Sequence, residues 1–439
     1  MNAVVDFPVK PEARGYLARF VPDDSEPGWL AARRQQAMTR FAELGFPNRK
    51  SESWRYLDLQ PLENQPLLPS PAAPRADTAA LSERLAHLSL PEAASRLVLV
   101  DGRFAPELST VEPRSGVWFG STAHAMRERP DLVRAAVEGI EGDEAHPFAA
   151  LNTAFFSDGF VLDIAPGVTL DRPLEIVHLG AGISESSFHT RSVVMLGEGS
   201  RAGIIETYAG EGRYWRNDLV GVLLGQRAEL TRTVLVEESA AAVHLAQIEA
   251  RLGEGARFTG FVLLLNGQRV RHEANIRMGE GAKCVINGAY VVTGSDEANI
   301  VTVVDHTAPG GQTSELIKGV AAGRGHGAFQ GRMIVREHAQ KTDAHQLSRN
   351  LIIGQRAVID TKPELEIYAD DVKCSHGASV GDLDETALFY LQARGIPADE
   401  ARRMLIDGFL REAVDTIEDI AKRTHLLRRL AGRLAELEG

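Results

Sequence analysis

The chain has 439 residues, a length that suits two or three folding units. Its 48 basic and 60 acidic residues give a formal net charge of −12, which argues against a nucleic-acid-binding protein, because such a protein presents basic residues to the phosphates. Hydrophobic residues make up 44% and charged residues 25% of the chain, and these globular values exclude a wholly disordered protein.

The first third of the chain has a mostly helical pattern with short strands. Apolar residues recur at helical spacing over 29–42, and Gly45 follows as a stop signal. A second helical pattern covers 130–140. Short apolar runs typical of strands occur at 97–100 and 117–119. We expect residues 1–145 to form an N-terminal, mostly helical domain with short strands.

From about residue 155, short β-rich runs alternate with glycine-containing turns. One turn phrase recurs, and its first glycines are Gly197, Gly225, Gly253, Gly279 and Gly354. The first four are separated by 28, 28 and 26 residues. A period in this range is typical of a solenoid in which each repeat forms one coil.

The repeat predicts the fold class. Strands with no helix between them favour a β-solenoid over a βαβ sheet, and the period is too long and irregular for a left-handed hexapeptide helix. We therefore predict a mainly β fold: a right-handed parallel β-helix over residues 146–375, flanked by N-terminal and C-terminal helical domains.

The C-terminal region, residues 376–439, is predicted to be a small helical domain. Its expected helices cover 384–393, a stretch that begins at Pro397, and 426–437. Within the second helix, apolar residues four apart form one stripe: Leu405, Phe409, Ala413 and Ile417. The stripe fits a surface that binds a partner, and it equally fits packing against a neighbouring helix.

Two features bear on nucleotides and on the compartment. Residues 197–202 match a dinucleotide-binding pattern, but a strand-like run follows where a phosphate site needs a helix N-terminus, so we read them as a coil turn.

Two cysteines are too few for a disulfide framework, and residues 1–8 lack the pattern of a secretory signal. No apolar run approaches the roughly 20 residues that cross a bilayer. We expect a cytoplasmic protein without a membrane segment.

Cys374 and His376 form the candidate metal site. They lie where the β pattern ends, and residues two apart in a strand face the same side. A thiol and an imidazole suit iron or zinc; a buried cysteine beside a hydrogen-bonded histidine is the alternative that the spacing leaves open. A thiolate-held cluster typically needs four cysteines, so other ligands would come from another chain. Cys284 is most simply a core cysteine.

A second polar stretch contains His338 and His345. These side chains could reach a metal, and an exposed coil edge explains them about as well.

Residues 362–378, which include Lys373-Cys374-Ser375-His376-Gly377, closely resemble the signature of the SufD branch of the SufB/SufD family, the scaffold proteins of the SUF iron–sulfur cluster assembly system. The similarity continues through 388–391, 394–397 and 408–410, and weaker matches reach back to about Glu52. It covers nearly the whole chain. The SufB branch would carry an acidic, histidine-bearing phrase at 373–378 and more cysteines.

The resemblance implies a non-catalytic subunit that assists iron acquisition and cluster assembly in a complex with SufB and two copies of the ATPase SufC. His376 matches the family histidine that helps to ligate the nascent cluster at the SufB interface, and Cys374 matches its neighbouring cysteine. Iron or a nascent cluster would be held transiently and shared with SufB, and this chain would bind no nucleotide. The isolated chain could form a homodimer.

The same resemblance assigns the two partner surfaces. The end of the β-helix would pair with SufB. The C-terminal helices would dock SufC, through residues that we expect to be Leu405, Gly408, Phe409 and Glu412.

An enzyme is the rival class, because parallel β-helices also host polysaccharide lyases and hydrolases. Glu364 and Glu366 share a strand face and could act as a carboxylate pair. The low aromatic content of 6% leaves few side chains to stack on sugars.

Overall fold

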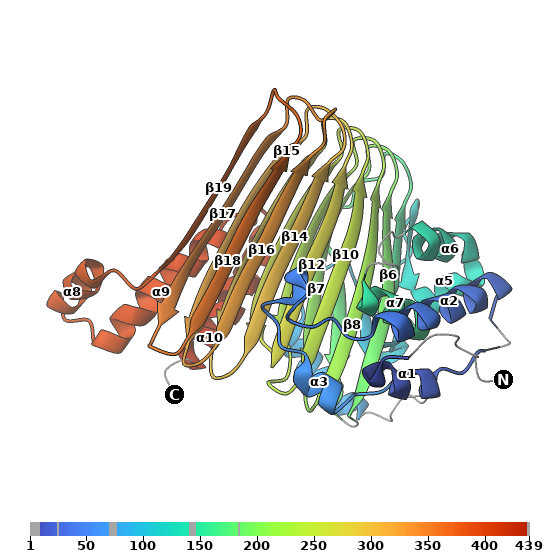
Figure 1. Cartoon of the computed structure of the whole chain (residues 1–439), viewed down its shortest axis with the longest axis horizontal. Helices are drawn as coiled ribbons and strands as arrows, with labels where there is room; N and C mark the ends of the chain where they lie inside the picture. Colours follow the sequence, from blue (N-terminus) through green and yellow to red (C-terminus); the bar gives the residue numbers. More distant parts are fainter. Residues whose placement is uncertain (1–8, 24–25, 70–76, 140–145, 183–184, 437–439) are drawn as a thin grey trace.

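The computed structural model describes residues 9–23, 26–69, 77–139, 146–182 and 185–436. Its centre is a parallel β-solenoid built from two long sheets (Figure 1). Alternate strands join the same sheet: one has the order β19-β17-β15-β13-β11-β9-β7-β5-β1-β2, and the other β18-β16-β14-β12-β10-β8-β6-β4-β3. Each coil thus adds one strand to each sheet. The predicted mainly β fold, a parallel solenoid between helical ends, is confirmed.

The solenoid strands are β4 (Phe160–Ile164), β5 (Leu174–Gly180), β6 (Ser186–Leu196), β7 (Arg201–Gly210), β8 (Tyr214–Leu224), β9 (Glu229–Glu237), β10 (Val243–Leu252), β11 (Arg257–Asn266), β12 (Arg269–Met278), β13 (Lys283–Val292), β14 (Glu297–His306), β15 (Gln312–Ala322), β16 (His326–Val335), β17 (Asp343–Ile353), β18 (Val358–Ile367) and β19 (Lys373–Gly381).

The coils stack in register, and the repeated turn phrase forms their corners. Val243 of β10 pairs with Trp215 of β8 on one side and with Arg269 of β12 on the other, so one coil separates residues 28 or 26 positions apart. The second glycine of the phrase has a positive φ, 64° at Gly199, where a side chain would be strained. Residues 197–200 therefore form a coil turn between β6 and β7, as predicted, and residues 201–202 begin β7.

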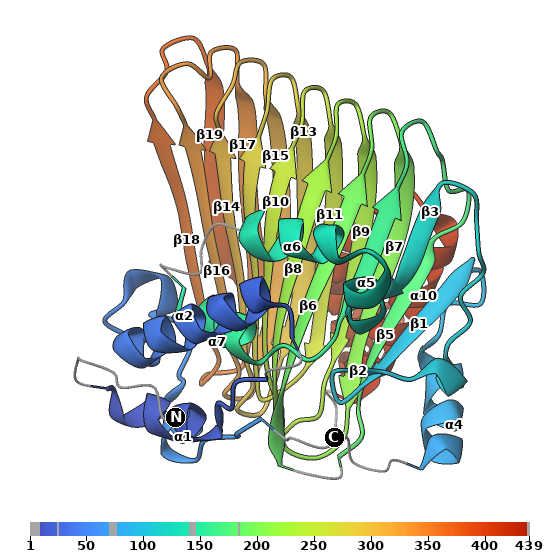
Figure 2. The ribbon, with the colours of Figure 1, turned by 90° about the vertical axis from the view of Figure 1, so that its right-hand side faces the viewer.

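The N-terminal region packs against the first coils and against the sheet that contains β8 and β10. Its helices are α1 (Arg14–Arg19), α2 (Gly28–Leu44), α3 (Gln60–Asn64), α4 (Thr78–Leu88), α5 (Thr122–Glu128), α6 (Pro130–Gly139) and α7 (Pro147–Phe155). Figure 2 shows α2, α5, α6 and α7 in front of the sheets, and α7 contacts β6 and β8. The helix predicted over 29–42 is α2, and Gly45 follows it with a φ of 66°; Ile140, at the end of the next predicted helix, lies outside the described residues.

The short strands of this region belong to the solenoid sheets. They are β1 (Ser95–Val100), β2 (Arg103–Phe104) and β3 (Val117–Ser121). β1 pairs in parallel with β5, and β3 pairs antiparallel with β4. Residues 95–121 are therefore the first layer of the solenoid, although they lie inside the expected domain 1–145.

At the other end, the solenoid continues beyond the expected boundary. β19 runs from Lys373 to Gly381 and pairs in parallel with β17. A boundary after residue 375 therefore falls inside a strand, because the backbone ladder to β17 extends the β structure past the point where the sequence pattern fades. His376 consequently lies within a strand of the last coil.

Three C-terminal helices follow: α8 (Glu385–Ala393), α9 (Ala398–Val414) and α10 (Ile420–Glu436). Asp384 caps α8 by accepting from the Thr386 and Ala387 amides. α9 contacts β13 and β15, and α10 contacts β11, whereas α8 extends away from the sheets at the left of Figure 1. Leu437, the last residue of the predicted third helix, lies outside the described residues. No helix in the described ranges is long and apolar enough to span a bilayer.

The apolar stripe predicted on α9 is displaced around the helix. The buried residues of α9 are Ala401, Ile406, Leu410, Ala413 and Val414, while Leu405 and Phe409 are only half-buried; Ile417 is buried beyond the end of the helix. The reason is geometric: residues strictly four apart drift by about 40° per step around a helix of 3.6 residues per turn, so a straight stripe must include a three-residue step.

Lys318 of β15 joins α9 to the sheet. The Lys318 side chain is 1% exposed; its ammonium donates to the Phe409 carbonyl at 3.0 Å and forms an ion pair with the Glu412 carboxylate. The same nitrogen lies 4.2 Å from the centre of the Phe409 ring. A single buried cation thus holds two residues of α9 against the outer face of the sheet.

We predict that Lys318→Ala destabilises the chain by about 2–4 kcal/mol, because it removes a buried charged donor and leaves a cavity under α9. Urea unfolding measures the loss, and limited proteolysis around 382–384 should speed up as α9 detaches. Lys341→Ala is the control, since Lys341 pairs with Asp371 on the exposed surface and should cost less than about 1 kcal/mol. Equal losses in the two variants would contradict the anchoring role.

Candidate functional site

The last coil of the solenoid has two sheet edges. β18 ends one sheet and β19 ends the other, and no further strand of the described chain pairs with either. Edge strands present unpaired backbone donors and acceptors to any chain that can add a strand. The inner faces of β18 and β19 also lack a following coil to cover them.

Cys374 and His376 lie on the inner face of this last coil. Cys374 pairs with Ala344, and His376 pairs with Gln346. Both partners are buried inside the preceding coil, and residues paired across neighbouring strands point to the same side of a sheet. The thiol and the imidazole therefore face the same way, as their spacing predicted; Cys374 is half-buried and His376 is exposed.

The Cys374 thiol lies against a small apolar cluster that contains Val335, Ala339 and Ala369. Burial raises the pKa of Cys374 above its ordinary value, and the nearby Asp343 charge adds to this. At neutral pH the thiol is protonated, so a metal ion must displace the proton to bind sulfur. Cys284 is buried in the core, as predicted, and its pKa is raised further, first by burial and then by the charge of Glu315.

His345 belongs to the opposite face. Its Nδ1 lies 2.7 Å from Ser375 Oγ, and its Nε2 lies 2.7 Å from an Asp343 carboxylate oxygen. Ser375 separates Cys374 from His376 in the strand, so its side chain points away from theirs. His338 is exposed. Across the described ranges, no group of three His, Cys, Asp or Glu side chains lies close enough to hold a metal ion.

Directly behind His376, two polar residues occupy the interior, and the sequence analysis missed both. Glu315, Gln346 and His376 pair in succession along β15, β17 and β19, so they form one inward column. Gln346 Nε2 donates to Glu315 Oε2 at 2.7 Å, and Thr302 Oγ1 donates to the same oxygen at 3.2 Å. Burial raises the pKa of Glu315 to about 7. Their separation by about one coil length was the signal available in the sequence.

The earlier coils hold a second polar cluster, in which charges are paired. Arg216 Nε lies 2.8 Å from Glu238 Oε1, and both side chains are fully buried. Burial alone would raise the pKa of Glu238, but Arg216 and the hydrogen bond from His244 outweigh it and lower the pKa to about 2. This cluster is a structural ion-pair network that spans neighbouring coils.

The four residues expected to bind a partner lie on α9 and divide into two groups. Phe409 and Glu412 are engaged with Lys318 inside the chain. Gly408 is exposed, with no atom within 4 Å of the position that a Cβ would take, and Leu405 is half-buried.

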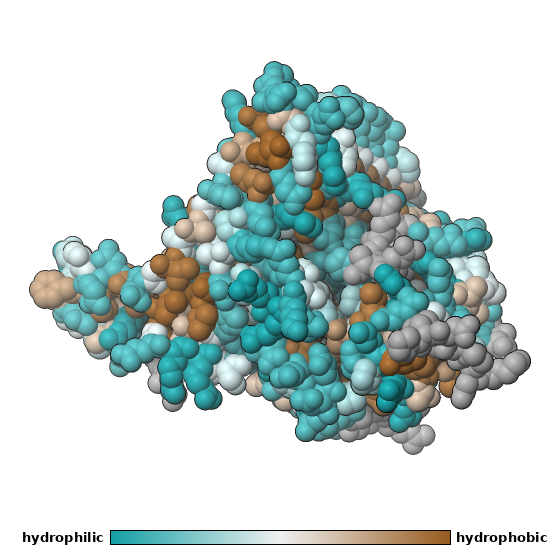
Figure 3. All heavy atoms as spheres, viewed as in Figure 1, coloured by the Kyte–Doolittle hydropathy of each residue, from teal (hydrophilic) through white to brown (hydrophobic). Residues whose placement is uncertain are grey.

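Exposed hydrophobic side chains gather at this end of the molecule. Among the large ones in the described residues, all except Val21 and Val111 lie between Val358 and Ile420. One group is on and beside the last coil: Val358, Ile367, Tyr368 and Val380. The other is on the C-terminal helices: Phe389, Tyr390, Met404 and Ile420. Figure 3 shows hydrophobic surface in this region, at the left of the view. Such grouping is typical of interaction surfaces.

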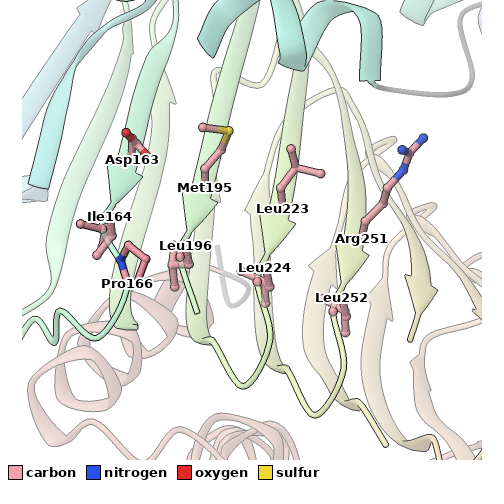
Figure 4. Close-up of a pocket in the computed structure, with 13 residues that line it drawn as sticks. Asp163, Ile164, Pro166, Met195, Leu196, Leu223, Leu224, Arg251 and Leu252 are labelled. Carbon is pink, nitrogen blue, oxygen red and sulfur yellow. The ribbon is translucent and has the colours of Figure 1, made fainter. Parts of the chain in front are cut away.

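A groove of about 670 Å³ crosses the C-terminal ends of four neighbouring strands, β4, β6, β8 and β10 (Figure 4). Asp163, Met195, Leu223 and Arg251 form one row along it, and the charged lining residues are Asp163 and Arg251. Asp163 pairs with Arg129 at 3.1 Å. The groove therefore presents no pair of carboxylates for glycoside chemistry.

Glu364 and Glu366, the carboxylates considered for an enzyme, lie on the outer face of β18. Glu364 is 3.0 Å from the Lys362 ammonium, and Glu366 is 3.5 Å from the Arg332 guanidinium. Each takes part in a surface ion pair, and neither lines the groove.

Comparison with known proteins agrees with the last-coil signature. Residues 178–409 match the family described as SUF system FeS cluster assembly, SufBD core domain, and residues 20–176 match the SufBD protein N-terminal region. The iron–sulfur cluster assembly protein SufD of Escherichia coli K12 is 30% identical over 91% of this chain and 92% of its own length. A SufBD family protein of Synechocystis is 29% identical over 90% and 88%, and the chloroplastic protein ABCI7 of Arabidopsis thaliana is 28% identical over 87% and 81%.

The raised pKa of Glu315 predicts a pH dependence of stability. Between about pH 4.5 and 7 the folded chain keeps a proton that the unfolded chain releases, so stability falls as the pH rises through this window. Glu315→Gln removes the effect, and its stability relative to the wild type should increase by up to about 3 kcal/mol from pH 5 to pH 8. Urea unfolding in metal-free buffer measures it, with Glu364→Gln as the surface control. A constant difference across this range would contradict the assignment.

Proposed function

The chain belongs to the SufBD family of iron–sulfur cluster assembly proteins, and from that premise we propose that it is the SufD-type scaffold subunit of a complex with SufB and the ATPase SufC. In this role it catalyses no reaction and assists iron acquisition and cluster assembly at its interface with SufB. A cytoplasmic location accompanies the proposal, because Cys284 and Cys374 are both free thiols and a metal-binding thiol must stay reduced.

One observation carries the proposal: Cys374 and His376 share the uncovered inner face of the last coil. A thiolate and an imidazole suit iron, but two ligands leave a four-coordinate ion half coordinated. The partner chain supplies the remaining ligands, so iron or a nascent cluster is held only when SufB closes over this face. The cluster is then transient cargo shared between two chains.

The last coil is the proposed SufB surface. A second solenoid that meets β18 and β19 continues both backbone ladders and covers the exposed Ile367, Tyr368 and Val380. The same edges allow a second copy of this chain to bind when SufB is absent, which accounts for the expected homodimer.

SufC docks, in this proposal, on the free surface of α8 and α9. Phe389 is 71% exposed, and Gly408 and Leu405 lie on the neighbouring helix. Phe409 and Glu412 bind Lys318 within the chain and are not part of the docking surface. A force on α9 therefore passes to β15. Dimerisation of two SufC subunits on ATP binding would then pull on the helices and open the SufB interface.

We predict that His376→Ala leaves the complex assembled but lowers the yield of iron–sulfur cluster by at least about tenfold, since it removes one of two ligands that this chain supplies. Copurification checks assembly, and visible absorbance after anaerobic reconstitution measures the cluster. His338→Ala, which changes another exposed histidine, should behave as the wild type. A normal yield from the His376 variant would remove the ligand role.

We predict that the double substitution Phe389→Ala and Tyr390→Ala weakens SufC binding by at least about tenfold while the melting temperature is unchanged, because both side chains are exposed. Affinity for purified SufC measures the effect. Val111→Ala, an exposed hydrophobic change elsewhere, is the matched control. A chain truncated before Pro397 should also lose SufC, and unchanged affinity in both altered chains would place the docking surface elsewhere.

A further inference from the structure

Glu315 differs from every other buried glutamate that the structure describes. Four of them pair with an arginine: Glu175 with Arg96, Glu206 with Arg232, Glu238 with Arg216, and Glu273 with Arg271. Glu315 is 2% exposed and has no arginine, lysine or histidine within ion-pair distance in the described chain. A buried carboxylate without a positive partner is costly, so its presence needs a physical reason.

Two oxygen atoms at this position lack hydrogen-bond partners. Both donors to Glu315, from Thr302 and Gln346, bond to Oε2, and Oε1 is buried without a partner. Gln346 Oε1 is buried and unpartnered as well. The two residues are neighbours in one column, joined by the 2.7 Å hydrogen bond. These two hydrogen-bonded neighbours therefore each have one buried acceptor oxygen that receives no hydrogen bond.

A proton on Glu315 would supply one donor, and Gln346 Oε1 is an unpartnered acceptor in the neighbouring residue. Once the carboxyl is ionised, neither oxygen has a donor. A divalent cation would then be bound by both oxygens and would neutralise the carboxylate.

The surroundings leave room for the Gln346 side chain. A Cβ at Gly331, on the facing sheet, would lie 2.1 Å from Gln346 Nε2. Only glycine at this place lets the amide lie across the interior beside Glu315. The next residue in the column is His376, an exposed residue on the uncovered face of the last coil.

We propose that Glu315 and Gln346 form an inner cation site, about one to two coil spacings below His376, that takes an oxygen-preferring divalent ion such as Fe²⁺ or Mn²⁺ with water completing the coordination. The inference deepens the proposed function, since it rests on iron entering at Cys374 and His376. The ligands of the inner site are oxygen atoms, whereas Cys374 and His376 offer sulfur and nitrogen. Because the ion prefers oxygen ligands, the inner site holds it before sulfide is present.

The test uses the metal-free, full-length chain titrated with Mn²⁺ at about pH 8, where Glu315 is ionised. Free Mn²⁺ is followed by electron paramagnetic resonance. The wild type should bind one ion, and Glu315→Gln should weaken binding by at least about tenfold. Glu364→Gln should stay within about twofold of the wild type. Mn²⁺ should raise the melting temperature of the wild type and not of Glu315→Gln.

Separate variants keep this proposal distinct from the outer site. His376→Ala and Cys374→Ser should keep Mn²⁺ affinity within about twofold, because Mn²⁺ prefers oxygen. Gln346→Leu should weaken it, as a second variant that leaves the carboxylate in place. No saturable binding by the wild type below about 1 mM, or equal binding by Glu315→Gln, overturns the inner site. A normal cluster yield from His376→Ala with Mn²⁺ binding intact would refute the outer role alone.

Discussion

The stacking of parallel coils is the constraint from which the rest of the molecule follows. Each strand satisfies its backbone groups on the strands one coil before and one coil after it, so the two ends of the stack are special places. At the first end, β1 pairs with β5 and β3 pairs with β4. The last end leaves β18 and β19 as edges. There the inward side chains reach solvent, and Cys374 and His376 are among them.

Each buried glutamate that the structure describes, except Glu315, has an arginine partner. Stacked columns bring acidic and basic side chains from neighbouring coils together, as with Arg232 and Glu206, which meet at 2.5 Å. Such pairs offset the cost of desolvation. Glu315 breaks the pattern within two coils of the uncovered end, and it does so in the column of His376. Glu315, the buried glutamate without an arginine partner, and His376, the candidate ligand, therefore lie in one inward column of the solenoid.

One strand, β15, contacts both helix α9 and the interior of the solenoid. β15 carries Glu315 toward the interior and Lys318 toward α9, three residues apart. Because Lys318 is buried and its bonds go to Phe409 and Glu412, α9 cannot move freely from the sheet. A force on the C-terminal helices would therefore reach β15, the strand that carries Glu315.

The sequence by itself determined the repeat, the coil corners, the limits of α8 at Asp384 and Ala393, and the shared face of Cys374 and His376, because these depend on spacing over a few residues or on a regular period. It misjudged the end of the solenoid and the buried face of α9, and it missed Glu315 and Gln346. The tertiary structure decided these features. The register between strands some 30 residues apart depends on the length of every intervening turn, and the partner of a buried charge depends on which side chains the facing sheet and the next coil bring to it.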